Sequence, residues 1–316
     1  MKILVSPTSL SPDSNSPALR LLRSFSDNLL FNPYGRPLIE NELIPLLADC
    51  QGFIAGVDFI TRKVIKNAPK LKVISRYGVG VDRVDLAAAK EKGIIVCNTP
   101  GVNSNAVADL TFALLLSLAR KVPYLDRNTR EGGWSRSVGF ELYGKTLAIL
   151  GLGAAGKAVA KRALGFSMKI LAYDHFSSRE FAYMHGIIPA SLEEAAREAD
   201  FLSIHLPLTA ETKNLVDAGI MKSMKKGAII INTARGGILD ETAAYELLKC
   251  GHLGGLGLDV FEAEPPGSSP LFELDSVVVT PHTGSHTAEA IAGMADLSVK
   301  NLIDVLSGKE CQYTVV

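Results

Sequence analysis

Residues 146–174 read TLAILGLGAAGKAVAKRALGFSMKILAYD, and this stretch predicts the fold of the chain around it. The apolar run at residues 146–150 is short enough for a strand buried on both faces. The pattern G-x-G-x-x-G follows at residues 151–156, and apolar residues then recur at helical spacing over residues 155–164. In a strand–turn–helix unit such glycines allow a tight turn, a close approach of the backbone to a pyrophosphate, and helix packing.

A second strand at residues 169–173 ends at Asp174, which lies 174 − 151 = 23 positions after Gly151. A carboxylate at this place accepts hydrogen bonds from both ribose hydroxyls of an adenosine, which favours NAD. The helix N-terminus adds free N–H groups and partial positive charge for the pyrophosphate. The glycines alone also fit an ordinary turn in which they serve packing and Asp174 is a solvated acid. Because strand, turn, helix and acid come in the required order, we expect a dinucleotide site.

Length and composition exclude several classes of protein. The chain has 316 residues, enough for two domains, and its charges cancel, since 33 − 33 = 0. No global field would therefore attract nucleic acid or an anionic membrane. The four cysteines form no C-x-x-C pair, and the N-terminus lacks an export signal. We expect a cytoplasmic protein with reduced thiols, no bound metal, and no nucleic-acid or membrane partner.

Buried strands alternate with helical patterns along the chain, which predicts an α/β fold of two doubly wound parallel-sheet domains. Residues 11–37, rich in proline and serine, are interpreted as loop-rich, and their elements are poorly predicted. In the first hundred residues we expect strands at 3–5, 52–55, 72–75 and 93–96 and helices at 41–48, 61–67 and 84–92.

A Pro-Gly pair at residues 100–101 precedes a long apolar helix at 103–120 and marks a domain boundary. An amphipathic helix at residues 285–306 is expected to return to the first domain. The domains predicted are therefore residues 1–98 with 285–316, and residues 99–284. Between the glycine pattern and the last helix we expect strands at 200–204, 228–232, 253–258 and 276–279 and helices at 192–198, 217–223 and 241–249.

Three segments of the second half place polar residues directly after an apolar strand. They read IIINTARGG at residues 229–237, GLDVFEAEPP at 257–266 and VVVTPHTGS at 277–285. Carboxyl ends of parallel strands meet at one edge of a sheet, where open α/β sheets bind ligands. The polar residues expected to share this edge with the glycine pattern are Arg235, Asp259, Glu264 and His282.

At these residues the sequence resembles the D-isomer-specific 2-hydroxyacid dehydrogenases, most closely the phosphoglycerate dehydrogenase branch. The resemblance covers nearly the whole chain and rests on RYGVGVD at 76–82, NTP at 98–100, the glycine pattern, NTARGG at 232–237, DVF at 259–261, EP at 264–265 and PH at 281–282. It implies a Rossmann NAD-binding domain and a flavodoxin-like substrate domain. It also implies NAD as cofactor, a small 2-hydroxy or 2-oxo acid as substrate, 3-phosphoglycerate and serine biosynthesis as the first expectation, and a homodimer paired through residues 103–120.

The resemblance also implies roles for single residues. Arg235 would hold the substrate carboxylate and carbonyl, His282 would be the acid/base, and Glu264 would orient it. The substrate-binding residues implied are Arg76, Val79, Gly80, Arg235 and His282. The cofactor-binding residues implied are Gly151, Gly153, Ala154, Ala155, Gly156, Asp174, His205, Pro207, Thr233, Ala234, Asp259, Gly284 and Ser285.

Chemistry supports these roles independently. Oxidising a secondary alcohol requires a base for the hydroxyl proton, and the imidazole of His282 titrates near the working pH. A neighbouring carboxylate such as Glu264 fixes the tautomer and raises the pKa of the imidazole. The planar fork of Arg235 can donate to a carboxylate and a carbonyl together. Taken singly, the three residues also fit a loop histidine, a loop acid and a surface ion pair.

Departures from the family pattern bear on the substrate. Ala154 and Ala155 replace a larger or polar residue and an Ile, but the backbone donors remain. Where phosphoglycerate enzymes commonly carry an Arg, residues 55–59 read AGVDF, and we expect Asp58 to repel a phosphate. Arg76 and Arg136 match arginines near the cleft and favour a phosphate. The sequence ends at Val316, and we expect a short form without a C-terminal regulatory domain.

Three alternative functions remain open at this point. The first, within the same class, is reduction of glyoxylate, hydroxypyruvate or another unphosphorylated acid. Formate oxidation is less favoured, because related formate enzymes place Gln where Glu264 stands. The third, from a different class, is an NAD-sensing binding protein similar to the corepressors that share this fold.

Overall fold

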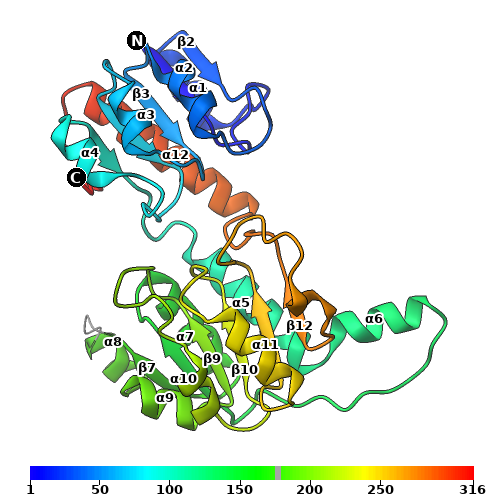
Figure 1. The fold of residues 1–316 in the computed structure, drawn as a ribbon. Coiled ribbons are helices and arrows are strands. Elements are labelled where there is room, and N and C mark those ends of the chain that lie inside the picture. Colours follow the sequence, from blue (N-terminus) through cyan, green and yellow to red (C-terminus); the bar gives the residue numbers. More distant parts are fainter. Residues whose placement is uncertain (175–178) are drawn as a thin grey trace. The chain divides into compact units, whose positions relative to one another are not determined.

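Two α/β units make up the chain, and each has its own parallel sheet (Figure 1). The computed structural model describes residues 1–174 and 179–316. Unit 1 comprises Met1–Asn103 and His286–Val316, and unit 2 comprises Ser104–Ser285. These bounds lie a few residues beyond the boundaries at 98/99 and 284/285 expected from the sequence. The prediction of two doubly wound α/β domains is confirmed.

The sheet of unit 1 has the order β2-β1-β3-β4-β5 and is parallel throughout. This is the flavodoxin-like strand order, with a switch point between β1 and β3. The inner strands consist of fully buried residues apart from Lys2, as expected for a sheet covered on both faces. The strands are β1 (Lys2–Val5), β2 (Asn28–Phe31), β3 (Gly52–Ala55), β4 (Val73–Arg76) and β5 (Ile95–Cys97).

The helices of unit 1 include one from the far end of the chain. Helix α12 packs on α1, β3 and β4, so the expected return of the last helix to the first domain is confirmed. The helices are α1 (Pro17–Phe25), α2 (Glu40–Leu47), α3 (Arg62–Lys66), α4 (Leu86–Glu91) and α12 (Ala288–Leu306).

The loop-rich residues 11–37 also contain α1 and β2, which the sequence pattern did not predict. Ser16 caps α1 by accepting a hydrogen bond from the Leu19 N–H at 3.2 Å, and Pro17 is the first helical residue. Ala18, Leu19 and Leu22 form the buried face. The frequent serines and prolines are therefore partly helix-start signals rather than loop signals.

The seven-stranded parallel sheet of unit 2 has the order β12-β11-β10-β9-β6-β7-β8. If β6 is numbered 1, the strands β8-β7-β6-β9-β10-β11 read 3-2-1-4-5-6, which is the Rossmann order. Strand β12 extends the sheet beyond β11. The point where the strand order reverses lies between β6 and β9. The strands are β6 (Thr146–Leu150), β7 (Lys169–Tyr173), β8 (Ile188–Pro189), β9 (Phe201–Ile204), β10 (Ile229–Asn232), β11 (Gly255–Leu258) and β12 (Val277–Val279).

Helices cover both faces of this sheet and bury two apolar clusters. Helices α5 and α7 pack against each other on one face, and α9, α10 and α11 lie on the other. The sequence did not predict α6, which projects from unit 2 (Figure 1). The helices are α5 (Ser104–Ala119), α6 (Val122–Arg130), α7 (Ala154–Gly165), α8 (Arg179–Met184), α9 (Leu192–Glu198), α10 (Ala218–Ser223), α11 (Glu241–Lys249) and the 3₁₀ helix η1 (Pro270–Glu273).

Within the described part of the chain, no helix combines the length and apolarity that crossing a membrane requires. The same residues hold no group of His, Cys, Asp and Glu side chains arranged to bind a metal ion.

Candidate active site

The glycine turn lies at the switch point of the unit 2 sheet. Gly151 has φ +97°, and a Cβ there would lie 2.7 Å from the carbonyl oxygen of His205. A Cβ on Gly156 would lie 1.9 Å from the carbonyl oxygen of Gly151. Gly153 is the N-cap of α7 and has open space around its Cβ position. Close packing at Gly151 and Gly156 with open space at the helix N-terminus fits a bound pyrophosphate, with Ala154 and Ala155 in the first turn.

Asp174 follows β7 directly, at the edge where the glycine turn lies. Its carboxylate accepts a hydrogen bond from the Leu152 N–H, inside the glycine turn. Gly151 N–H also donates to the carbonyl oxygen of Tyr173 at 2.8 Å, which ties the two segments together. The acid thus lies beside the turn, as an NAD ribose requires.

His205 closes the other side of the switch point. Its Nε2 lies 2.8 Å from the Ser203 hydroxyl, while its buried Nδ1 has no hydrogen-bond partner among the described residues. Burial lowers the pKa of His205 to about 4, so its imidazole is neutral at neutral pH. Pro207 accepts a hydrogen bond from the Thr212 hydroxyl at 2.6 Å and so fixes the following loop.

Strands β10, β11 and β12 bring the expected catalytic residues to this same edge. The three strands are parallel neighbours, so their carboxyl ends align. Arg235 follows β10, Asp259 follows β11, and His282 follows β12. The convergence expected from the sequence is therefore present within unit 2.

The loop of His282 is organised by Asp259, which is 1 % exposed. The Asp259 carboxylate accepts hydrogen bonds from the Thr280 hydroxyl at 2.6 Å, the Thr283 N–H at 2.7 Å and the Gly284 N–H at 2.8 Å. A Cβ on Gly284 would lie 3.0 Å from the same carboxylate. Asp259 thus shapes the loop up to Ser285, where unit 2 ends, while its contact with the cofactor stays a prediction.

His282 and Glu264 form a hydrogen-bonded pair. Nδ1 of His282 lies 2.9 Å from Oε2 and 3.1 Å from Oε1 of Glu264. The His282 side chain is 35 % exposed and that of Glu264 is 19 % exposed. Because a carboxylate accepts the Nδ1 proton, Nε2 is the atom left to exchange a proton with a substrate. The pair has the geometry expected of an oriented acid/base.

Arg235 lies on a loop held by Asn232, which is almost completely buried. Asn232 Nδ2 donates to the carbonyl oxygen of Arg235 at 2.8 Å, and Asn232 Oδ1 accepts from the Ala234 N–H at 3.1 Å. The hydroxyl of Thr233 lies 2.9 Å from that of Thr111 on α5. The guanidinium of Arg235 donates to the Ala234 carbonyl oxygen at 2.7 Å. These contacts fix the backbone that carries the guanidinium.

Sequence reasoning did not single out Asn232 or Thr280 as parts of the site. Asn232 holds the Arg235 loop, and Thr280 donates to Asp259. Both are polar residues at or just after an apolar strand. That position was the available signal, because a polar side chain buried at a strand end must find partners in the adjoining loop.

The expected substrate-binding residues of unit 1 lie at the end of β4 and just after it, at the carboxyl edge of its sheet. Arg76 is 5 % exposed and donates to the carbonyl oxygens of Gly80 and Ala55, each at 3.0 Å. Asn98 Nδ2 donates to the carbonyl oxygen of Val79 at 2.9 Å. Arg76 and Asn98 therefore fix the backbone of residues 78–80. A direct contact of Arg76 with substrate stays a prediction.

The expected repulsion of a substrate phosphate by Asp58 stays a prediction, but the structure gives this carboxylate partners within unit 1. Asp58 is 1 % exposed, accepts from the Leu38 N–H at 2.7 Å and is hydrogen-bonded to the Ser6 hydroxyl. Its carboxylate therefore stabilises the loops after β1 and before α2. Arg136, the second arginine considered for a phosphate, is exposed in the loop after α6.

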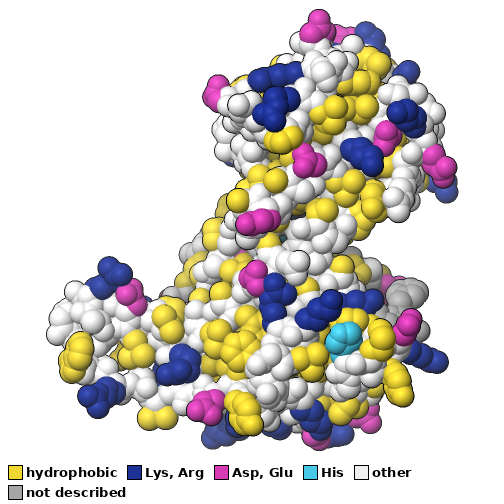
Figure 2. Space-filling model, turned by 180° about the vertical axis from the view of Figure 1, so that it is seen from behind, with side chains coloured by type: hydrophobic (Ala, Val, Ile, Leu, Met, Phe, Trp, Pro, Cys, Tyr) yellow, Lys and Arg dark blue, Asp and Glu magenta, His cyan; other side chains and the backbone are white. Residues whose placement is uncertain are grey.

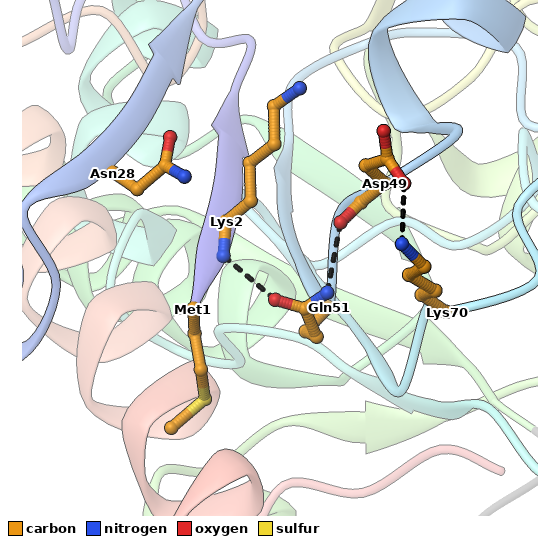
Figure 3. A pocket seen from close by; sticks show the side chains of 6 residues that line it. All are labelled: Met1, Lys2, Asn28, Asp49, Gln51 and Lys70. Carbon is orange, nitrogen blue, oxygen red and sulfur yellow. Dashed lines mark hydrogen bonds and ion pairs between the residues drawn. The ribbon is translucent and has the colours of Figure 1, made fainter.

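A surface depression of about 540 Å³ lies at the opposite, amino-terminal edge of the unit 1 sheet. Its polar groups contact one another, as Figure 3 shows: Gln51 Oε1 accepts from the Lys2 N–H at 2.7 Å, and the Lys70 ammonium lies 2.6 Å from the Asp49 carboxylate. None of the residues that line the depression belongs to the predicted site. The residues that line it are Met1, Lys2, Asn28, Asp49, Gln51 and Lys70.

Comparison with known proteins agrees with this geometry. Residues 112–284 match the family described as D-isomer specific 2-hydroxyacid dehydrogenase, NAD binding domain. The chain is 45 % identical over 283 residues to a D-3-phosphoglycerate dehydrogenase of Methanocaldococcus jannaschii, covering 88 % of this chain but 54 % of that relative. It is 45 % identical over 261 residues to a glyoxylate reductase of Thermococcus litoralis, covering 80 % and 79 % of the two chains.

A solved structure, the TT0316 protein from Thermus thermophilus, superposes over the whole of both chains with a TM-score of 0.89 and 41 % identity. The chain belongs to the D-isomer specific 2-hydroxyacid dehydrogenase family, and unit 2 contains its NAD-binding domain. The family resemblance and the NAD cofactor expected from the sequence are thereby confirmed. The chain spans about half the length of the phosphoglycerate dehydrogenase that it matches.

Proposed function

We propose that this chain interconverts a small D-2-hydroxy acid and its 2-oxo acid with NAD. The observation that carries this proposal is the His282–Glu264 pair, with Nδ1 of the imidazole 2.9 Å from the carboxylate, on the sheet edge of the glycine turn. An oriented imidazole beside a dinucleotide site is what the reversible oxidation of an alcohol requires.

Each residue has a definite task in this reaction. His282 takes the hydroxyl proton on Nε2 during oxidation and returns it to the carbonyl oxygen during reduction. Glu264 holds the Nδ1 proton and so fixes the tautomer. Arg235 donates to the carboxylate of the substrate and to the oxygen on its carbon 2, which orients the reacting carbon. When bound, the cofactor would take the hydride from that carbon as NAD⁺ during oxidation and supply it as NADH during reduction.

The substrate that we favour is an unphosphorylated short acid, with glyoxylate or hydroxypyruvate as the 2-oxo form. In support, the Arg76 guanidinium donates to backbone carbonyls at 3.0 Å and lies almost buried, so it is engaged within unit 1. The 45 % identity to the glyoxylate reductase of Thermococcus litoralis supports the same class of substrate.

D-3-phosphoglycerate, and with it a role in serine biosynthesis, is the second candidate. It draws support from the 45 % identity to the Methanocaldococcus jannaschii enzyme and from the exposed guanidinium of Arg136. A phosphate recognised by this chain would need a cationic partner of that kind.

A homodimer in the cytoplasm completes the proposal. Exposed apolar side chains gather on the projection formed by α6 and the following loop, which lies to the left in Figure 2. Trp134 is 83 % exposed and Val138 is 89 % exposed. A second copy is the occupant that we propose for this projection, beside the pairing through residues 103–120 that the resemblance implies, since apolar surfaces of this kind mark interfaces. The thiols of all four cysteines are free, in keeping with a reducing compartment.

Turnover of NADH with a panel of 2-oxo acids tests the proposal. We expect the highest kcat/KM with glyoxylate or hydroxypyruvate and a lower value with 3-phosphohydroxypyruvate. Binding of NADH without turnover of any acid in the panel would favour an NAD-sensing protein instead. Light scattering after size-exclusion chromatography tests the dimer, and Trp134→Ser with Val138→Ser should shift it to monomer.

A further inference from the structure

The turn that carries Glu264 is held by the same segment that carries Arg235. A Cβ on Gly236 would lie 1.9 Å from the Phe261 carbonyl oxygen, so the backbone after Arg235 packs directly on this turn. The segment continues into α11, which begins at Glu241. Oε1 of Glu241 accepts a hydrogen bond from the Glu262 N–H at 2.7 Å. The turn is thus anchored at two successive residues.

We propose that Glu241 is a positioning residue that fixes the turn Phe261–Glu264 and thereby keeps the Glu264 carboxylate on Nδ1 of His282. The expected effect on kcat rests on the proposed function, whereas the anchoring of the turn by Glu241 does not.

The hydrogen bonds inside the turn explain how Glu241 would reach His282. The Phe261 N–H donates to Oε1 of Glu264 at 3.3 Å, and that same oxygen lies 3.1 Å from Nδ1 of His282. The next amide along the chain, that of Glu262, is the one held by Glu241. Release of this amide would let the turn rotate and carry the Glu264 carboxylate away from the imidazole.

The position of Glu241 suits an anchor that acts through its acceptor oxygen. It lies in the first turn of α11, where free backbone N–H groups favour a carboxylate. Burial raises the pKa of Glu241; the hydrogen bond from the Glu262 N–H opposes this shift, and the nearby carboxylates of Glu262 and Glu264 add to it. A glutamine keeps the acceptor oxygen without adding a third negative charge. We therefore expect Glu241→Gln to preserve the turn and Glu241→Ala to release it.

Three variants test this inference. Glu241→Ala removes the acceptor, Glu241→Gln retains it, and Glu246→Ala removes an exposed acid of the same helix as the matched control. We expect Glu241→Ala to lower kcat about tenfold, the usual effect of one lost hydrogen bond, with the Kd for NADH unchanged. Amide hydrogen exchange of the peptide that contains Glu262 should become faster in this variant. Glu241→Gln and Glu246→Ala should match the wild type in both measurements.

Equal exchange of the turn in the wild type and in Glu241→Ala would overturn the inference, as would equal damage by Ala and Gln. A rise in KM alone, with kcat retained, would also contradict positioning of the acid/base. If the wild type turns over no 2-oxo acid, the proposed function fails. The exchange measurement would still decide whether Glu241 anchors the turn, because it does not depend on activity.

Discussion

Nδ1 of His282 lies 2.9 Å from Oε2 of Glu264, although His282 has the left-handed backbone conformation, with φ +50°. A non-glycine residue in that region costs about 1 kcal/mol or more, so neighbouring contacts must hold it there. The His282 N–H donates to the carbonyl oxygen of Asp259 at 2.8 Å, and the Asp259 carboxylate binds the residues on both sides. These hydrogen bonds of Asp259 thus offset the cost of the left-handed backbone at His282, and in this conformation the imidazole contacts Glu264.

We expect His282→Asn to lower kcat by about 10²- to 10⁴-fold, the usual contribution of a positioned general acid/base. The Kd for NADH should stay within about twofold of the wild type, because His282 acts on the substrate proton. Stopped-flow single turnovers and fluorescence titration with NADH measure the two quantities. His185→Asn, a histidine whose Nδ1 contacts the Phe181 carbonyl oxygen at 2.9 Å, is the control. A variant that retains wild-type kcat would remove His282 from the chemistry.

Gly236→Ala should damage both stability and activity. The added Cβ would overlap the Phe261 carbonyl oxygen at 1.9 Å, and backbone on both sides must shift to relieve it. We expect a loss of about 1–3 kcal/mol in the free energy of unfolding and a lower kcat. Gly165→Ala is the matched control, because nothing lies within 4 Å of its Cβ position. Denaturant melts and steady-state kinetics measure the effects, and equal behaviour of the two variants would contradict the close packing at Gly236.

Strand order predicted which residues share this edge of the sheet, and the family resemblance predicted the His282–Glu264 pair, but the partners that hold the loops in place were not predicted. Apolar strands followed by Arg235, Asp259 and His282 sufficed to place these residues at one edge, because parallel strands align their carboxyl ends. The burial of Asp58 was not predictable, since its partners Ser6 and Leu38 lie 52 and 20 positions away. Only the tertiary fold brings such partners together.

Asp174 should give a preference for NADH over NADPH. Its carboxylate lies beside the glycine turn, where it would repel a 2′-phosphate. We expect kcat/KM to favour NADH by about tenfold or more, and Asp174→Ser to narrow this ratio while keeping an oxygen for the Leu152 N–H. Glu180→Gln, which neutralises an exposed acid of α8, serves as control. Steady-state kinetics with both cofactors decide the point, and a wild type that prefers NADPH would contradict it.

Burial of His205 should make the chain less stable in mild acid. Its folded pKa of about 4 lies below the unfolded value of about 6.5, so the unfolded chain takes up the proton first. The free energy of unfolding is therefore unaffected by His205 above about pH 6.5. It decreases as the pH falls towards 4, by at most about 3 kcal/mol from this residue. His205→Gln should flatten the free energy of unfolding between pH 6.5 and 4.5. Urea melts followed by circular dichroism across this window test the prediction, and an unchanged slope in the variant would contradict it.

Arg76→Ala should raise the KM for phosphorylated and unphosphorylated 2-oxo acids alike. The guanidinium donates to the carbonyl oxygens of Gly80 and Ala55, so its loss would loosen residues 78–80 rather than remove a phosphate contact. Hydroxypyruvate and 3-phosphohydroxypyruvate form the matched pair of substrates, and Arg62→Ala, which breaks an exposed ion pair with Glu91, is the control variant. We expect the two KM values to rise by the same factor, within about twofold. A rise confined to 3-phosphohydroxypyruvate would instead assign the phosphate to Arg76 and make 3-phosphoglycerate the favoured substrate, because only a phosphorylated acid would then lose a charge-assisted hydrogen bond.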